Sequence, residues 1–144
     1  HVYVFCGMGS MSAIRPGGKG DIDKTHVTWN RRKVVPKKSS PLLLNGLLFM
    51  VSDEGVASCS NPLNGEIYWA DRLKVKGQCA SSPIHASGRI YSFSSDGDCI
   101  VFKAQKEGLE ILAHNKLPNG CMASPAVVGD SLLVRTKDTV YRFN

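Results

Sequence analysis

The stretch that decides the fold is Ser40-Pro41-Leu42-Leu43-Leu44-Asn45-Gly46-Leu47-Leu48-Phe49, and it recurs twice further along the chain. The second copy is Ser82-Pro83-Ile84-His85-Ala86-Ser87-Gly88-Arg89-Ile90-Tyr91, and the third is Ser124-Pro125-Ala126-Val127-Val128-Gly129-Asp130-Ser131-Leu132-Leu133. The prolines of successive copies are 42 residues apart. A fixed period of this length is typical of repeat architectures, in which each repeat is one supersecondary unit.

Each copy has the pattern of a tight β-hairpin. A short apolar strand follows Ser-Pro, a two-residue turn interrupts it, and a second apolar strand continues. The turns are Asn45-Gly46, Ser87-Gly88 and Gly129-Asp130, which are residue types that accept the positive φ angles of hairpin turns.

Two more strands follow the hairpin within the repeat. Asp53-Glu54-Gly55 is a turn leading to a third strand at 56–59, and Asn61–Gly65 leads to a fourth strand at 66–69. Four short antiparallel strands make one blade of a β-propeller. We therefore predict an all-β fold, a partial β-propeller of four-stranded antiparallel blades with a 42-residue repeat.

Two other fold classes explain the pattern less well. Turn residues recur too often for a helix, and the stretch that best tolerates a helix, 103–113, contains Gly108. A β-sandwich could use similar strands, but it gives no reason for a regular period.

We expect a single partial propeller domain over 1–144, divided into a partial blade (1–34), two blades (35–76 and 77–118) and a partial blade (119–144). The opening segment matches second, third and fourth strands, with Gly7-Met8-Gly9 as its first turn. Closed propellers typically have four to eight blades. Two explanations stay open: the chain is the C-terminal portion of a longer protein, or copies associate to complete the ring.

The net charge of +6 comes from 18 basic and 12 acidic residues, and much of the excess lies in 31–33 and 37–38. Such a run is either a solvated loop or a contact for an anionic partner. We expect no nucleic-acid partner, because the run lacks interleaved aromatic residues for base stacking. We also expect no membrane span, because the apolar stretches are too short.

The five cysteines form no CxxC pair and no cluster with histidine at zinc spacing, so the sequence predicts no metal site. Cys79 and Cys121 each stand four residues before a repeat proline. We interpret both as small buried residues on an inner strand. Free thiols suit a reducing cytoplasm.

The repeats resemble those of the pyrroloquinoline-quinone-like β-propeller family, which includes bacterial outer-membrane assembly lipoproteins. The resemblance covers essentially the whole chain and rests on the Ser-Pro hairpins, the turns 52–55 and 95–97, and the segment 64–69. It implies a bacterial envelope or exported protein, periplasmic or secreted, with the cytoplasm as the alternative.

The segment ending at Trp69 resembles the family's tryptophan docking motif, with Gly65 and Trp69 in register. The resemblance implies that Trp29, Gly65 and Trp69 dock neighbouring blades, and it places Leu112 at the tryptophan position of the next repeat. Three motif positions differ and are occupied by Cys59, Asn61 and Asn64.

The sequence predicts no catalytic residue and no cofactor. A quinoprotein dehydrogenase of this family would carry adjacent cysteines, and no two cysteines here are adjacent. We therefore predict a non-catalytic scaffold or binding module with a protein partner or self-association, and an anionic or glycan ligand as a further option. The alternative is part of a quinoprotein-like dehydrogenase whose site lies in missing blades. The residues expected at a contact are Arg15, Lys19, His26, Lys37, Lys38 and His85.

Overall fold

The structure, a computed structural model, describes residues 1–6 and 9–144 and is built from antiparallel strands. Gly7 and Met8, which belong to the predicted first turn, lie outside the described residues. Within the described residues there is no helix, and so none that could cross a membrane. The predicted all-β class is confirmed.

Across residues 1–6 and 9–144, the strands form four separate sheets, two with three strands and two with four. The first sheet has the order β1-β2-β3 and the second has the order β4-β5-β6-β7. The third has the order β11-β10-β9-β8 and the fourth has the order β12-β13-β14. The strands are β1 (Val2–Cys6), β2 (Ser10–Ile14), β3 (Val27–Arg31), β4 (Leu42–Leu44), β5 (Leu47–Val51), β6 (Val56–Ser60), β7 (Ile67–Arg72), β8 (Ile84–Ala86), β9 (Arg89–Phe93), β10 (Asp98–Lys103), β11 (Ile111–Lys116), β12 (Ala126–Val128), β13 (Ser131–Arg135) and β14 (Val140–Phe143).

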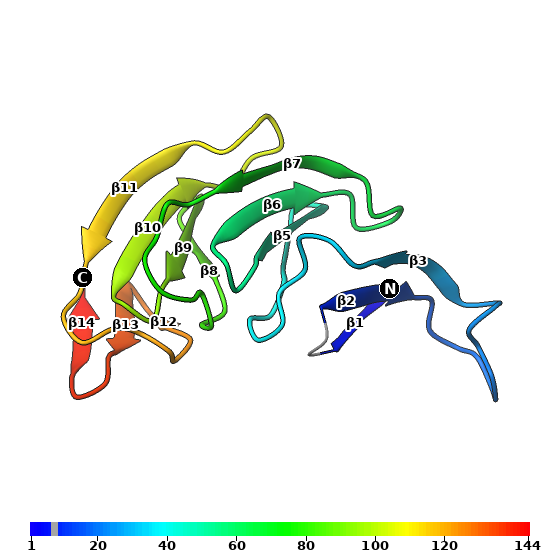
Figure 1. Ribbon diagram of the computed structural model, residues 1–144, viewed down its shortest axis with the longest axis horizontal. Helices are drawn as coiled ribbons and strands as arrows, with labels where there is room; N and C mark the ends of the chain where they lie inside the picture. Colours follow the sequence, from blue (N-terminus) through cyan, green and yellow to red (C-terminus); the bar gives the residue numbers. More distant parts are fainter. Residues whose placement is uncertain (7–8) are drawn as a thin grey trace.

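The four sheets follow one another along an arc, and β3, β7 and β11 run along its outside (Figure 1). Every neighbouring strand pair within a sheet is antiparallel and close in sequence. The arrangement confirms the predicted class, a partial propeller of antiparallel blades.

The first two predicted hairpins are confirmed by their backbone angles and register, and the third by its register, with Val128 paired to Ser131. Asn45 and Gly46 have φ angles of 49° and 73°, and the corresponding Ser87 and Gly88 have 50° and 74°. Two successive positive φ angles are the requirement of a type I′ turn, whose twist matches that of the flanking strands. These turns fix the pairing of β4 with β5 and of β8 with β9.

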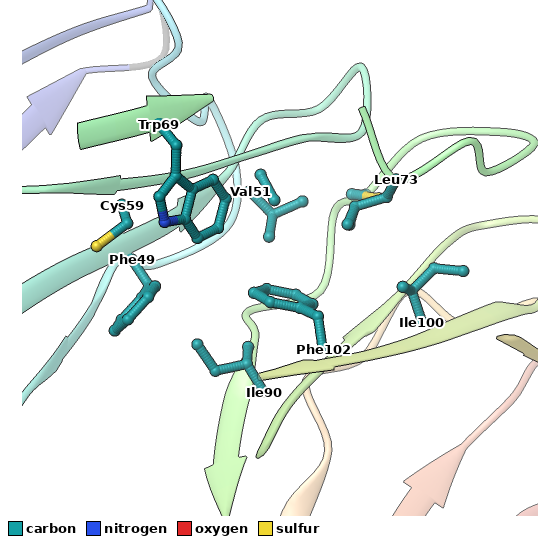
Figure 2. Packing of buried hydrophobic residues seen from close by; sticks show 10 residues of the cluster. Phe49, Val51, Cys59, Trp69, Leu73, Ile90, Ile100 and Phe102 are labelled. Atoms are coloured by element: carbon teal, nitrogen blue, oxygen red, sulfur yellow. The ribbon is translucent and has the colours of Figure 1, made fainter. Parts of the chain in front are cut away.

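The apolar core lies between neighbouring sheets. Between the second and third sheets, Trp69 contacts Phe49 and Phe102, with ring centroids 6.4 Å and 6.5 Å away. Figure 2 shows these rings with aliphatic side chains of both sheets around them. Apolar clusters also join the first sheet to the second and the third to the fourth, so each pair of neighbouring sheets buries apolar side chains between them.

The repeated Ser-Pro pair also has a structural reason. The backbone N–H of Ser40 donates to Oγ of Ser82, and the N–H of Ser82 donates to Oγ of Ser124, both over 2.9 Å. Each serine thus hydrogen-bonds its equivalent in the next sheet, 42 residues further on. We call this chain of contacts the serine ladder.

One register position repeats in three sheets, each time beside a β-bulge. Trp29 pairs with Ala13, Trp69 pairs with Cys59, and Ala113 pairs with Val101. The expectation that Leu112 holds the tryptophan position is therefore wrong. Leu112 is the extra residue of the bulge, so it lies one residue before the docking position, and it is 45% exposed.

Candidate partner-binding surface

Two buried carboxylates hold the segments that connect one sheet to the next. In the linker before β4, the backbone N–H of Lys37 donates to Oδ1 of Asp53 over 2.8 Å. Oδ2 of the same carboxylate lies 3.8 Å from Nζ of Lys38. The Asp53 side chain is 8% exposed, whereas the side chains of both lysines are half exposed. The buried anion therefore fixes a linker whose lysines reach solvent.

Asp98 serves the next linker in the same way. Its Oδ2 accepts the backbone N–H of Lys76 over 2.8 Å, and its Oδ1 lies 2.9 Å from Nε2 of His114 and 3.3 Å from Nζ of Lys116. Burial alone would raise the pKa of Asp98, but the hydrogen bonds from these three residues outweigh it and lower the pKa to about 2. Asp98 is therefore ionised at neutral pH and compensates the cations around it.

These linkers join into one continuous surface. Nζ of Lys38 donates to Oε1 of Gln78 over 2.7 Å, which connects the linker before β4 to the linker before β8. The backbone N–H of Cys79 donates to the carbonyl of Asp53, and that of Ser95 to the carbonyl of Gln78. We call the exposed side chains of residues 32–38 and 74–78 the linker surface. Its exposed cations are Arg32, Lys33, Lys37, Lys38, Lys74 and Lys76.

The first predicted contact group lies away from the linker surface. Arg15, Lys19 and His26 belong to the loop that precedes β3, whereas the linker surface begins after β3 ends. A five-residue strand separates them by about 17 Å. Within the loop, Nη2 of Arg15 donates to the carbonyl of Thr25 over 2.7 Å, and Oγ1 of Thr25 lies 2.7 Å from Nδ1 of His26. The structure brings Arg15 and His26 together, and it brings Lys37 and Lys38 together elsewhere.

His85 joins neither group. It lies on β8, half-buried, and its Nε2 accepts the backbone N–H of Gly88 over 3.1 Å. The side chain thus bonds its own hairpin, and it also lines a cavity beside the fourth sheet.

The predicted docking residues lie where neighbouring sheets meet. Nε1 of Trp29 donates to the carbonyl of Pro62 over 2.9 Å, and Nε1 of Trp69 donates to the carbonyl of Gln105 over 3.2 Å. Gly65 lies so close to the Trp29 ring that a Cβ there would be 2.8 Å from Cδ2 of the indole. These contacts agree with the role that we propose for the three residues.

Arg31 departs from the expectation of a solvated basic run. It is 9% exposed, and burial lowers its pKa. Its guanidinium lies 5.3 Å from the centroid of the Trp29 ring and donates to the carbonyl of Gly65. Arg31 ends β3 inside the contact between the first two sheets, so only the rest of the run can meet a partner.

The cysteines whose side chains the structure describes are buried and free. Burial raises the pKa of Cys59, Cys79 and Cys99 to about 11, which keeps these thiols protonated and unreactive. Cys79 and Cys121 lie in the linkers before β8 and β12, so their expected place on an inner strand is wrong. They are buried because each linker packs under the preceding turn.

Sequence reasoning missed the role of the buried carboxylates. Aspartate in a turn ordinarily bonds the backbone of its own turn, but Asp53 and Asp98 each accept a backbone N–H from the preceding linker. The two residues are not 42 positions apart, so the repeat conceals their common role. A sequence pattern that could have predicted this contact is an aspartate in the turn after a blade's second strand, together with basic residues in the linker that precedes that blade.

No family model matches the chain, and no curated protein matches it. Among solved structures, BamB from Moraxella catarrhalis is similar with a TM-score of 0.70 and 16% identity, over 95% of this chain and 40% of that one. BBS1N, in complex with ARL6DN, is similar with a TM-score of 0.65 and 15% identity, over 96% of this chain and 40% of BBS1N. A europium-containing methanol dehydrogenase reaches 0.53 at 14% identity, over 76% of this chain and 22% of the enzyme.

The chain thus spans less than half of the length of each of these proteins. At such identities the likeness shows the fold alone, and one fold can carry both enzymes and binding proteins. The shared fold is a β-propeller built of antiparallel blades.

Proposed function

We propose that this chain is part of a non-catalytic β-propeller that binds a protein partner through its linker surface. The observation that carries the proposal is the pair of buried carboxylates, Asp53 and Asp98, which hold lysine-bearing linkers in place. Binding surfaces gain affinity when their groups are ordered beforehand, because less conformational freedom is lost on binding. The likeness to BamB and BBS1N, a protein whose structure includes a bound partner, supports a propeller of this kind.

The partner chemistry follows from the exposed charges. Lys37 and Lys38 are half exposed, and Glu54, 3.5 Å from Nζ of Lys37, is an exposed acid near them. A surface with this excess of cations attracts an acidic segment and steers its approach. We propose an acidic stretch of a partner protein as the ligand, with an anionic glycan as an alternative.

The test measures binding of a fluorescent ten-residue oligo-glutamate peptide by anisotropy, with wild type and the double variant Lys37→Glu/Lys38→Glu. We expect the variant to bind at least about tenfold more weakly, and the wild-type affinity to fall as salt rises. Lys103→Glu is the matched control, because Lys103 is 52% exposed, is paired with Glu110 at 3.2 Å, and ends β10 away from the linkers. Equal loss in both variants, or no binding by wild type, would refute the proposal.

Self-association is the other expected form of partnership. The same variants can be examined by sedimentation equilibrium over a range of concentrations. A dimer that disappears in Lys37→Glu/Lys38→Glu and persists in Lys103→Glu would show that the linker surface binds a second copy, in place of a different protein.

We further propose membership of the pyrroloquinoline-quinone-like propeller family and an address in the bacterial envelope, periplasmic or secreted. The free thiols no longer oppose an oxidising compartment, since the described ones are buried with raised pKa values. Fractionation of cells that produce the protein tests the address, and recovery from the cytoplasm alone would contradict it.

The dehydrogenase alternative rests on fold likeness to the methanol dehydrogenase. The family resemblance implies adjacent cysteines beside the cofactor of a quinoprotein dehydrogenase, and this chain has no two adjacent cysteines. The dehydrogenase alternative therefore needs a site in blades that this chain does not contain.

A further inference from the structure

A cavity of about 790 Å³ lies between the third and fourth sheets. Its apolar wall consists of Tyr91, Phe93 and Val101 from the third sheet, and Leu132 and Phe143 from the fourth. Its volume lies within the range of pockets that hold small molecules. Between the second and third sheets, the corresponding space contains the indole of Trp69.

The two spaces have equivalent walls. Four wall residues of the cavity stand 42 positions after their equivalents around Trp69. The fifth, Phe143, is the equivalent of Phe102 by strand pairing. Leu132 pairs with Phe143 just as Ile90 pairs with Phe102. The equivalent pairs are Phe49 and Tyr91, Val51 and Phe93, Cys59 and Val101, Ile90 and Leu132, and Phe102 and Phe143.

The two interfaces differ in the residue at the docking position, and Ala113 packs against the cluster that contains the cavity-lining Phe93 and Val101. Trp69 pairs with Cys59, and its equivalent Ala113 pairs with Val101, each beside the same bulge. An alanine cannot reach the space that an indole occupies, so the walls are left without the aromatic side chain that fills the other interface. Apolar cavities of this origin bind flat hydrophobic molecules.

Another part of the cavity lining carries polar and charged side chains. His85, Asn115, Lys116 and Asp130 line it beside the aromatic wall. A ligand that fits both parts has an aromatic ring for the apolar wall and a hydrogen-bonding substituent for the polar one.

We propose that this cavity binds a small molecule with an indole-sized aromatic ring, which takes the place that Trp69 takes in the preceding interface. The ring packs between Tyr91 and Phe143, as the indole of Trp69 packs between Phe49 and Phe102. This site is separate from the linker surface, so either proposal can fail without the other.

The test uses 5-fluoroindole and follows its ¹⁹F NMR signal with increasing protein. We expect wild type to bind the probe, and Ala113→Trp to bind at least about tenfold more weakly because the new side chain fills the ring position. Leu112→Trp is the matched control, since it adds the same indole one residue earlier at an exposed bulge position. It should bind the probe within about twofold of wild type.

A graded variant keeps the test decisive if Ala113→Trp does not fold. Ala113→Phe adds a smaller ring, and it should weaken binding of the probe by an amount between those of wild type and Ala113→Trp. The proposal is overturned if wild type does not bind the probe, if the Ala113 variants bind it as wild type does, or if Leu112→Trp weakens it equally. Lys37→Glu/Lys38→Glu should bind 5-fluoroindole normally.

Discussion

Two interfaces between neighbouring sheets have walls of equivalent residues, but one contains a buried indole and the other contains a cavity. Between the second and third sheets, Trp69 contacts Phe49 and Phe102 and is only 8% exposed. Between the third and fourth sheets, Ala113 holds the same register position, and a cavity of about 790 Å³ lies along the equivalent wall. The comparison indicates that the hairpins and the serine ladder set the blade scaffold, whereas the residue at the docking position distinguishes the two interfaces. We call the interface that contains Trp69 the solid interface, and the interface that contains the cavity the receptive interface.

The largest expected effect comes from emptying the solid interface. Trp69→Ala removes a buried indole and its hydrogen bond to the carbonyl of Gln105, and it should lower the free energy of unfolding by about 3–5 kcal/mol. Urea denaturation monitored by circular dichroism measures it. Leu112→Ala, at an exposed position, is the control and should cost under about 1 kcal/mol. Similar losses in both variants would contradict the docking role.

The interface between the first and second sheets can be disrupted at Gly65, which packs against the Trp29 ring. Gly65 has a φ of +76°, and a Cβ there would meet the Trp29 ring at 2.8 Å, so Gly65→Ala should cost about 2–4 kcal/mol through strain and overpacking. Gly46→Ala is matched in backbone, with φ of +73° and open space, and should cost only about 1 kcal/mol. The difference in urea midpoint between the two variants isolates the contact with Trp29.

The stability that Asp98 contributes at the solid interface depends on pH. The pKa of Asp98 is about 2 in the folded chain against an ordinary 3.8, so its stabilisation is present above pH 4 and is lost as pH falls toward 2. Asp98→Asn should lower the free energy of unfolding by about 2 kcal/mol at pH 7 and by much less at pH 2.5.

Asp96→Asn is the control for that measurement. Asp96 lies in the same turn but is exposed, and its carboxylate bonds only Oγ of Ser95 among the hydrogen bonds described. Its substitution should change stability little at either pH. Equal pH dependence in wild type and Asp98→Asn would show that Asp98 does not hold the linker.

The smallest expected effect compares the serine ladder across both interfaces. Ser82→Ala removes the acceptor for Ser40 in the solid interface, and Ser124→Ala removes the acceptor for Ser82 in the receptive one. Because the two bonds have the same length of 2.9 Å, each loss should cost about 0.5–1 kcal/mol in thermal or urea unfolding. Clearly unequal costs would mean that the sheets dock differently beyond the tryptophan position.

The fold could be predicted because its signals are local. Asn45-Gly46 and Ser87-Gly88 specify their own turns, and the period repeats them at equal spacing. The docking role of the tryptophans, in contrast, was expected from the resemblance of the segment ending at Trp69 to a family motif. The equivalence of Ala113 with Trp69 was missed because the chain between the paired residues of β10 and β11 is two residues longer than that between the paired residues of β6 and β7. Cys59 and Val101 are 42 residues apart, but their partners Trp69 and Ala113 are 44 apart, so counting by 42 does not find Ala113.

The candidate surface was predicted only in part. Lys37 and Lys38 stand out as a charge run, but their fixed positions depend on Asp53, a carboxylate 16 residues away that is buried by tertiary packing. Arg31 looked equivalent to them in sequence and is buried against Trp29 instead. Which cations face solvent is decided by how the sheets meet, and a single sequence does not state that.

The most direct test of the central claim is chemical rescue of Trp69→Ala by indole. If one side chain accounts for the difference between the interfaces, this variant gains a ring-sized cavity, and added indole should raise its melting temperature in a concentration-dependent way. Trp69→Leu, which refills part of the space, should respond less. A melting temperature of Trp69→Ala that does not change with indole would contradict the account.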